Sequence, residues 1–218
     1  MPQTVALFHS FVGVAASLTC IAEYMHMQPA IAAGTADMPN FIKAMAFVGT
    51  FIGGITATGS LVAFGKLNGS IFGKSVSSAA RPPPGGQVTN LALLAGSFAP
   101  LYPMMADNSI SLEQGVQYMM APTVGSAILG VTLTDAVGGA DMPVIITVLN
   151  SYSGWALAAE GFLLNNNMLV GVGSLIGTSF KYYYYYCRDK IIAEIIFGCT
   201  RKFATAIINP LYYYFNNE

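Results

Sequence analysis

The sequence predicts an all-α fold, a polytopic bundle of about six transmembrane helices with an atypical C-terminal tail. Of its 218 residues, 54% are hydrophobic and only 9% are charged, whereas roughly 25% of the residues of an average soluble domain carry charge. The mean hydropathy is +0.57. The apolar residues also gather in runs close to the ~20 residues with which a helix crosses a ~30 Å hydrocarbon layer. Together these properties indicate an integral membrane protein.

Six apolar segments are expected to form the helices. A bilayer core holds no water to satisfy backbone polar groups, and these runs are longer and more continuously apolar than the alternating strands of a membrane barrel. The segments are residues 4–22, 41–64, 88–105, 115–134 and 143–164, and a sixth that begins at Met168. Small residues four positions apart predict close helix packing. These pairs are Gly49 with Gly53, Ser126 with Gly130, and Gly173 with Gly177.

The basic residues predict the orientation. The loop 65–87 holds three of them, and the region after the sixth segment holds five more. They are Lys66, Lys74 and Arg81 in the loop, then Lys181, Arg188, Lys190, Arg201 and Lys202. Six alternating crossings put both regions on one side, which then collects every Lys and Arg except Lys43. The positive-inside rule makes that side the cytoplasmic or matrix side.

Several function classes find no support in the sequence. The net charge of −1 gives no reason to expect nucleic acid as a partner. Cys20, Cys187 and Cys199 are scattered and predict neither a disulfide framework nor a metal site. Residues 171–177 (GVGSLIG) superficially resemble a dinucleotide fingerprint, but the spacing is wrong and no strand–turn–helix context surrounds them. We therefore predict no cofactor-binding and no metal-binding residue in this chain.

His9 and Asn150 are the first candidates for a functional role. His9 lies five residues into the first segment, and Asn150 lies seven residues past Pro143 in the fifth. If both helices enter from the inner side, the two residues lie roughly 8 and 10 Å deep at 1.5 Å per residue. A histidine suits proton binding and release, and ionisable groups inside a membrane are functional candidates. The alternative is a histidine satisfied by a backbone carbonyl or exposed at the interface.

Other polar residues have simpler interpretations. The polar cluster 150–153 (Asn, Ser, Tyr, Ser) could hydrogen-bond across helices and hold them together. Asp141 precedes Pro143, where it could cap the start of the fifth helix. Glu160 falls near the far interface, where exposure to headgroups or water accounts for it. Asp135 is expected to be solvated in the inner loop.

Residues 138–167 resemble a known family. They read GGADMPVIITVLNSYSGWALAAEGFLLNNN, which is similar to the membrane domain of the proton-translocating NAD(P) transhydrogenases, in their β-subunit or its mitochondrial equivalent. Further similarity follows in family order at residues 5–24 (VALFHSFVGVAASLTCIAEY), 58–69 (TGSLVAFGKLNG), 130–143 (GVTLTDAVGGADMP) and 169–179 (LVGVGSLIGTS). The resemblance therefore covers residues 1–179.

The resemblance implies an enzyme, a proton-translocating NAD(P)+ transhydrogenase, whose hydride transfer between NAD(H) and NADP(H) is coupled to proton passage. His9 matches the family's intramembrane proton-binding histidine, and Asn150 matches its partner asparagine. Asp141 matches the acidic residue at the face toward the NADP(H)-binding domain. The expected partners are the lipid bilayer, the remaining transhydrogenase helices, soluble domains that carry NAD and NADP, and a second copy in a homodimer. The expected location is the mitochondrial inner membrane, or else another organelle membrane or a bacterial cytoplasmic membrane.

The sequence departs from the family after Ser179. Residues 180–218 contain five consecutive tyrosines, and we expect them to be a low-complexity tail outside the family, such as intron read-through would produce. We expect residues 1–179 to be an incomplete proton-translocating domain that is not a self-sufficient enzyme. Two alternatives stay open: a non-enzymatic proton channel or structural partner built from the same helices, and a truncated fragment without function.

Overall fold

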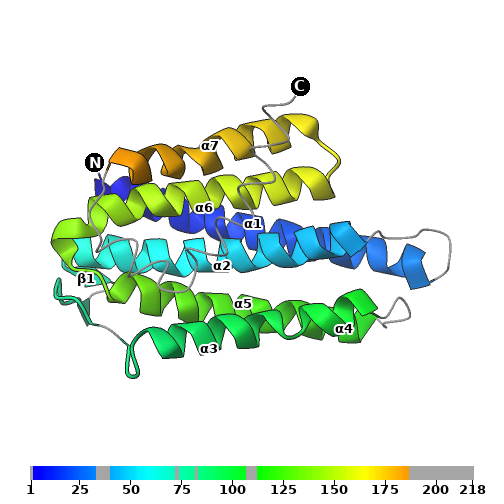
Figure 1. Ribbon diagram of the computed structural model, residues 1–218, viewed down its shortest axis with the longest axis horizontal. Helices are drawn as coiled ribbons and strands as arrows, with labels where there is room; N and C mark the ends of the chain where they lie inside the picture. Colours follow the sequence, from blue (N-terminus) through cyan, green and yellow to red (C-terminus); the bar gives the residue numbers. More distant parts are fainter. Residues whose placement is uncertain (1, 33–39, 72–73, 82, 107–111, 187–218) are drawn as a thin grey trace.

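The computed structural model describes residues 2–32, 40–71, 74–81, 83–106 and 112–186, which form an antiparallel bundle of helices (Figure 1). The helices are α1 (Pro2–Ala32), α2 (Asn40–Asn68), α3 (Gln87–Phe98), α4 (Leu101–Ala106), α5 (Leu112–Asp135), α6 (Met142–Leu163) and α7 (Asn167–Tyr186). A 3-10 turn, η1 (Gly139–Asp141), precedes α6. Two-residue strands, β1 (Ser70–Ile71) and β2 (Lys74–Ser75), pair antiparallel after α2. The predicted all-α bundle is confirmed.

Four of the described helices are long and apolar enough to cross a membrane. They span Pro2–Met27, Asn40–Asn68, Glu113–Asp135 and Gly139–Leu163. The sixth expected segment begins in α7, whose apolar part, Asn167–Thr178, is shorter. The third is divided between α3 and α4. By length and composition the described residues therefore support four spans, and the count of six stays a prediction.

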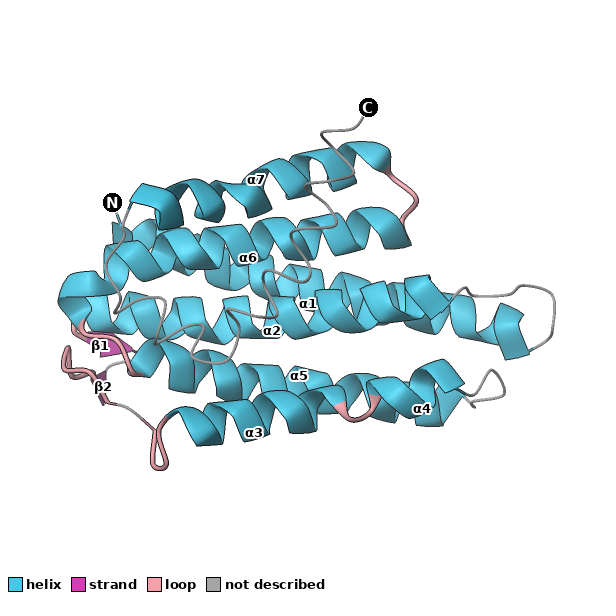
Figure 2. Cartoon of the chain, viewed as in Figure 1, coloured by secondary structure: helices cyan, strands magenta, loops and turns pink. Residues whose placement is uncertain are grey.

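The third segment was expected to be continuous, and the structure corrects this. A turn at residues 99–100 separates α3 from α4 (Figure 2). The cause is Pro100, because proline has no backbone N–H to donate and its ring collides with the carbonyl four residues earlier. Pro103 removes a second donor inside α4. The apolar run alone gave no reason to place a helix end there.

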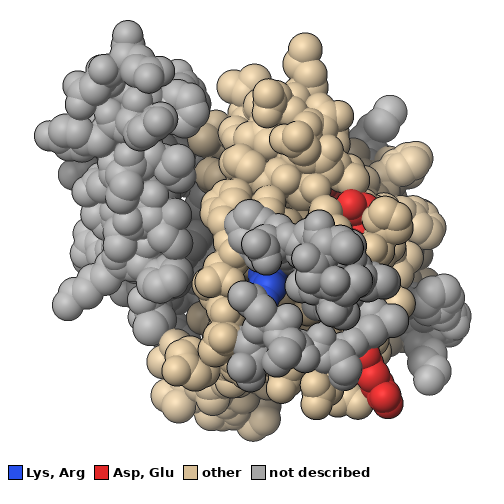
Figure 3. Space-filling model, turned by 90° about the vertical axis from the view of Figure 1, so that its right-hand side faces the viewer, with Lys and Arg blue, Asp and Glu red and all other residues tan. Residues whose placement is uncertain are grey.

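The bundle has two distinct ends. We call the inner end the one where α1, α3 and α6 begin and α2, α5 and α7 end; β1 lies there, on the left in Figure 1. Lys66, Lys74 and Arg81 lie at this end, and α7, which contains Lys181, runs toward it. The structure thus places these basic residues at one end of the bundle, while the remaining basic residues of the tail lie outside the described ranges. That this end faces the cytoplasm or matrix stays a prediction. Seen from the opposite, outer end, charged side chains are sparse on the described surface (Figure 3).

Glycine allows the helices to approach each other closely. A Cβ atom added at Gly13 of α1 would lie 2.5 Å from the Ala57 nitrogen and 2.7 Å from the Gly53 oxygen of α2. One added at Gly173 of α7 would lie 2.5 Å from the Ala158 nitrogen of α6. Real Cβ atoms do not come so near to backbone atoms. The close-packing role predicted for Gly53 and Gly173 is confirmed.

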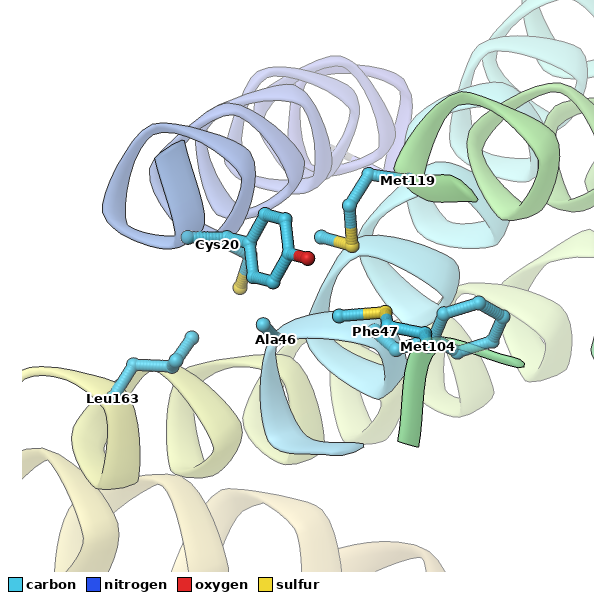
Figure 4. Packing of buried hydrophobic residues seen from close by; sticks show 7 residues of the cluster. Cys20, Ala46, Phe47, Met104, Met119 and Leu163 are labelled. Atoms are coloured by element: carbon cyan, nitrogen blue, oxygen red, sulfur yellow. The ribbon is translucent and has the colours of Figure 1, made fainter. Parts of the chain in front are cut away.

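Clusters of buried apolar residues lie near both ends of the bundle, around the central helix α2. The outer cluster joins five helices (Figure 4) and contains Cys20 and Tyr24 of α1, Ala46 and Phe47 of α2, Met104 of α4, Met119 of α5, and Leu163 of α6. The inner cluster contains Ala6, Ala63, Val137, Met142, Ile145, Ile146 and Leu149. The inner cluster includes Leu149, the residue immediately before Asn150. The candidate site therefore lies next to packed, buried side chains.

Candidate functional site

His9 and Asn150 meet between α1 and α6. The Nε2 atom of His9 lies 2.9 Å from the Oδ1 atom of Asn150, although 141 residues separate them in the sequence. His9 stands seven residues after Pro2 and Asn150 eight residues after Met142, so each lies roughly 11 to 12 Å from the start of its helix. Both helices start at the inner end, so His9 and Asn150 lie at similar distances from that end, as predicted. The two side chains share a hydrogen bond.

The second ring nitrogen of His9 is also engaged. Its Nδ1 atom lies 2.8 Å from the backbone oxygen of Val5, one turn earlier in α1. A carbonyl oxygen can only accept, so Nδ1 must carry a hydrogen and donate it. The bond to a carbonyl that sequence reasoning offered as the alternative to a functional histidine is therefore present beside the bond to Asn150. It orients the ring, and Nε2 remains the atom that can gain or lose a proton.

The two partners of His9 define how the site can change state. When Nδ1 holds a hydrogen, Nε2 of a neutral imidazole can only accept, so it must face the NH2 group of Asn150. When the ring is protonated, Nε2 donates, and it must face Oδ1. An asparagine side chain can present either group after a half-turn of its amide. The same pair of positions thus accommodates both protonation states of His9 with a hydrogen bond in each.

The two serines of the polar cluster donate hydrogen bonds along their own helix. The Ser153 hydroxyl donates to the Leu149 carbonyl at 2.9 Å, and the Ser151 hydroxyl donates to the Thr147 carbonyl at 3.4 Å. Such bonds to the preceding turn satisfy a hydroxyl inside a helix. The hypothesis that this cluster joins helices therefore holds for Asn150 and is wrong for the Ser153 hydroxyl.

Asp141 is apart from the pair. It occupies the N-cap position of α6, with Pro143 at the start of the helix as expected, but its side chain makes no capping hydrogen bond. Asp141 thus occupies the predicted capping position but does not form the capping hydrogen bond. Asp141 is exposed at the inner end, nine residues before Asn150 and roughly 13 Å from it along the helix axis. Within the described ranges, no three His, Cys, Asp or Glu side chains gather as metal ligands.

A buried ion pair at the inner end was missed by the sequence analysis. The Lys66 side chain is fully buried, and its Nζ atom lies 2.9 Å from the Asp135 carboxylate. The same atom donates to the backbone oxygens of Asp135 at 2.7 Å and Val137 at 2.8 Å. Asp135 was expected to be merely solvated, which is wrong. The sequence did contain one sign of this ion pair. Lys66 lies near the end of a helix beside the apolar residues Phe64 and Leu67, where a lysine needs a partner.

Backbone hydrogen bonds tie the loop before α3 to the same junction. The Arg81 amide donates to the Asp135 oxygen at 2.8 Å, and the Gly139 amide donates to the Ser78 oxygen at 2.8 Å. Together with Lys66 these bonds hold the turn between α5 and α6 in place. That turn carries η1 and therefore Asp141. The inner end of α6 is a braced structure, even though Asp141 itself has no capping bond.

Comparison with known proteins shows the family of the chain. The NAD(P) transhydrogenase beta subunit family matches residues 1–206. The chain belongs to this family. The NAD(P) transhydrogenase subunit beta of Rhodospirillum rubrum is 36% identical to this chain over 181 residues. The same subunit from Rhodospirillum rubrum strain ATCC 11170 matches with the same identity over the same length. The match covers 82% of this chain and 36% of the relative, so the chain spans about a third of the length of this transhydrogenase subunit.

The family match also bears on the tail. It runs past Ser179 to residue 206, and α7 continues without a break from Asn167 to Tyr186. The backbone of this transhydrogenase-family chain thus shows no helix end at Ser179. The division into residues 1–179 and a tail of residues 180–218 stays a prediction, and most of that tail lies outside the described residues.

Proposed function

We propose that this chain is the membrane proton-translocating part of an NAD(P) transhydrogenase, with His9 as the group that binds and releases the transported proton. The single observation that supports this best is the 2.9 Å contact between His9 Nε2 and Asn150 Oδ1, with Nδ1 held by Val5. An ionisable group within a membrane helix is costly and is kept where it serves function. Here it has a partner suited to both of its charge states.

The proposed proton transfer takes place at one atom. Neutral His9 holds its hydrogen on Nδ1 and takes a proton from water at Nε2. The resulting imidazolium donates from Nε2 to Asn150 Oδ1, which stabilises the charged form. Loss of that proton to water restores the neutral ring, and a half-turn of the Asn150 amide lets its NH2 group donate back.

Coupling to hydride transfer is proposed to pass through the inner end. NAD and NADP would bind to soluble domains outside this sequence, and the exposed Asp141 would face the NADP(H)-binding domain. Its turn is braced to α2 through Lys66 and leads directly into α6, so a contact at Asp141 can reach Asn150 through one rigid helix. The lipid bilayer, the remaining transhydrogenase helices and a second copy are further proposed partners. A mitochondrial inner membrane is proposed as the location, and the bacterial relative fits a bacterial cytoplasmic membrane equally.

The proposal is tested by reconstitution with the nucleotide domains. The chain is expressed in membranes together with NAD(H)- and NADP(H)-binding domains, and proton uptake is followed during NADPH oxidation by an NAD analogue. We expect His9→Ala to abolish coupled proton uptake. The control is His26→Ala, because His26 is an exposed histidine on the same helix and its loss should leave the rate unchanged.

Two outcomes would contradict the proposal. Wild-type activity in His9→Ala would remove His9 from the proton path. Proton flux through the chain without any nucleotide domain would favour the alternative of a non-enzymatic proton channel.

A further inference from the structure

Lys66 connects two separate segments of the chain at the inner end of the bundle. Besides the Asp135 and Val137 oxygens, its Nζ atom lies 3.4 Å from the backbone oxygen of Ala79. Ala79 belongs to the loop between α2 and α3, whereas Asp135 ends α5 and Val137 lies in the turn that leads to α6. One side chain of α2 thus bonds the α2–α3 loop and the α5–α6 turn at the same time.

The burial of Lys66 indicates more than a gain in stability. Replacing a whole buried ion pair with well-packed apolar residues often costs no stability, because burial removes the hydration of both charges. What an ammonium group adds is direction, since each of its three N–H donors needs an oxygen. The Lys66 side chain is fully buried, and the oxygens around Nζ come from both segments. These contacts therefore specify one arrangement of the loop against the turn.

Further contacts join the loop and the turn into one surface. The Gly139 amide donates to the Ser78 oxygen, and the Arg81 amide donates to the Asp135 oxygen. A Cβ atom added at Gly139 would lie 3.2 Å from the Ser78 Cβ atom, so the loop packs directly on η1. We call the exposed residues of the two segments the junction surface; they are Ser78, Ala79, Ala80 and Arg81 of the loop and Ala140 and Asp141 of the turn.

The junction surface is connected to the candidate pair through α6. This helix runs without a break from Met142 to Leu163, so a displacement of the turn carries Asn150 with it. The contact between His9 and Asn150 is 2.9 Å long, and a separation of about 3.6 Å is no longer a hydrogen bond. A movement of about 0.7 Å away from His9 would therefore break the contact.

We propose that Lys66 is a positioning residue for coupling, which holds the junction surface in the arrangement that the NADP(H)-binding domain docks on. This rests on the proposed function. Lys66 meets no partner itself, because its side chain is fully buried. Arg81 and Asp141 are both exposed and carry opposite charges. The docking face of the partner should thus present an acidic group to the loop and a basic group to the turn.

The first test follows coupled proton uptake against the concentration of the NADP(H)-binding domain. Membranes that hold the chain receive the NAD(H)-binding domain in excess and the NADP(H)-binding domain in increasing amounts. If Lys66→Met leaves the junction surface formed in about a tenth of the molecules, the half-saturating concentration rises about tenfold. Saturating domain selects the formed state and should restore the maximal rate to within about twofold. A wild-type half-saturating concentration in Lys66→Met would overturn the proposal.

A second pair of variants leaves Lys66 in place. Gly139→Ala puts a methyl group against the Ser78 side chain and separates the loop from the turn. Gly138→Ala is the matched control, because the nearest atom to an added Cβ is there the Ser78 oxygen, at 4.0 Å. We expect Gly139→Ala to raise the half-saturating concentration and Gly138→Ala to leave it unchanged. Equal effects of the two substitutions would contradict the docking role of the junction surface.

The outcomes separate this inference from the proposed function. His9→Ala should abolish the maximal rate at every concentration of the domain. If His9→Ala keeps activity, the proposed function fails, and the inference that rests on it fails too. If His9→Ala abolishes uptake while Lys66→Met lowers only the maximal rate, or changes nothing, the positioning role of Lys66 is refuted and the proposed function stands.

A spectroscopic measurement needs no activity. In a background without the three cysteines, a nitroxide spin label attached through Ala140→Cys reports the motion of the junction surface. A label attached through Leu175→Cys reports α7, where Leu175 is 74% exposed. We expect Lys66→Met to increase the motion at position 140 and to leave position 175 unchanged. Equal loosening at both positions would show a general loss of structure, and no loosening would show that Lys66 does not hold the turn; either result would overturn the proposal.

Discussion

Replacing Lys66 with methionine removes the one charged side chain that is fully buried at the junction of α2, α5 and α6. Methionine has nearly the length and shape of lysine, so packing is largely kept. The lost interactions are the 2.9 Å ion pair with Asp135 and the hydrogen bonds to the Asp135 and Val137 oxygens at 2.7 and 2.8 Å. The Val137 oxygen then loses a buried donor, which carries a desolvation cost of its own.

The expected cost follows from these contacts. Breaking a buried ion pair by removing one partner costs about 3–5 kcal/mol, and each hydrogen bond to a charged group contributes about 1.5–3 kcal/mol. Asp135 remains 33% exposed and can be hydrated once Lys66 is gone, which places the loss near the lower end. We expect Lys66→Met to lower the free energy of unfolding by about 3 kcal/mol. Asp135→Asn should cost less, about 1–2 kcal/mol, because the amide oxygen still accepts from Nζ.

The assay is equilibrium unfolding by SDS in mixed micelles, followed by the fluorescence of the single tryptophan, Trp155. Trp155 lies in α6 and packs on Gly177 of α7, so its signal reports the helix that the junction braces. Arg81→Met is the matched control, since it removes an exposed positive charge from the same end.

A double variant tests the ion pair directly. Once Lys66 is absent, Asp135→Asn removes only an unpaired carboxylate, so its added cost should be under about 0.5 kcal/mol, and the two costs should not add. The reasoning is refuted if Lys66→Met costs under about 1 kcal/mol or no more than Arg81→Met, or if the two costs are additive.

Two further predictions use the same unfolding assay. Gly13→Ala places a methyl group 2.5 Å from the Ala57 nitrogen and should cost about 1–3 kcal/mol by overpacking. Gly96→Ala, where nothing lies within 4 Å, should be neutral or stabilise by up to about 1 kcal/mol, and equal effects would show that α1 and α2 are not in close contact. Ser153→Ala should change stability by under about 0.6 kcal/mol, because the hydroxyl donates to the Leu149 oxygen of its own helix. A larger loss would restore the view that Ser153 joins helices.

The candidate pair shows how far sequence reasoning reached. The helical rise per residue and the positions of His9 and Asn150 in their segments predicted similar depths, and the 2.9 Å contact agrees. The same reasoning could not decide between a backbone carbonyl and Asn150 as the partner of His9, and the structure contains both bonds. The functional role of the pair follows from the family resemblance and stays to be tested.

Other residues were misjudged because their role depends on what lies opposite. Asp135 and Lys66 are 69 residues apart, and neither charge pattern nor helix spacing relates them. Glu160 was assigned to the interface from its depth alone, and the structure shows it only partly exposed. The break at Pro100 is different in kind, because the proline was visible in the sequence and was overlooked in favour of the apolar run.

The sequence by itself determined that this protein is a bundle of membrane helices with a basic inner end. These are local properties: a run of apolar residues satisfies its backbone within one helix, and loop charge sets orientation. Only the tertiary structure decided which polar side chains meet, such as His9 with Asn150 and Lys66 with Asp135. Such contacts depend on the rotation and register of helices that are distant in sequence, and the apolar pattern of each helix leaves both undetermined.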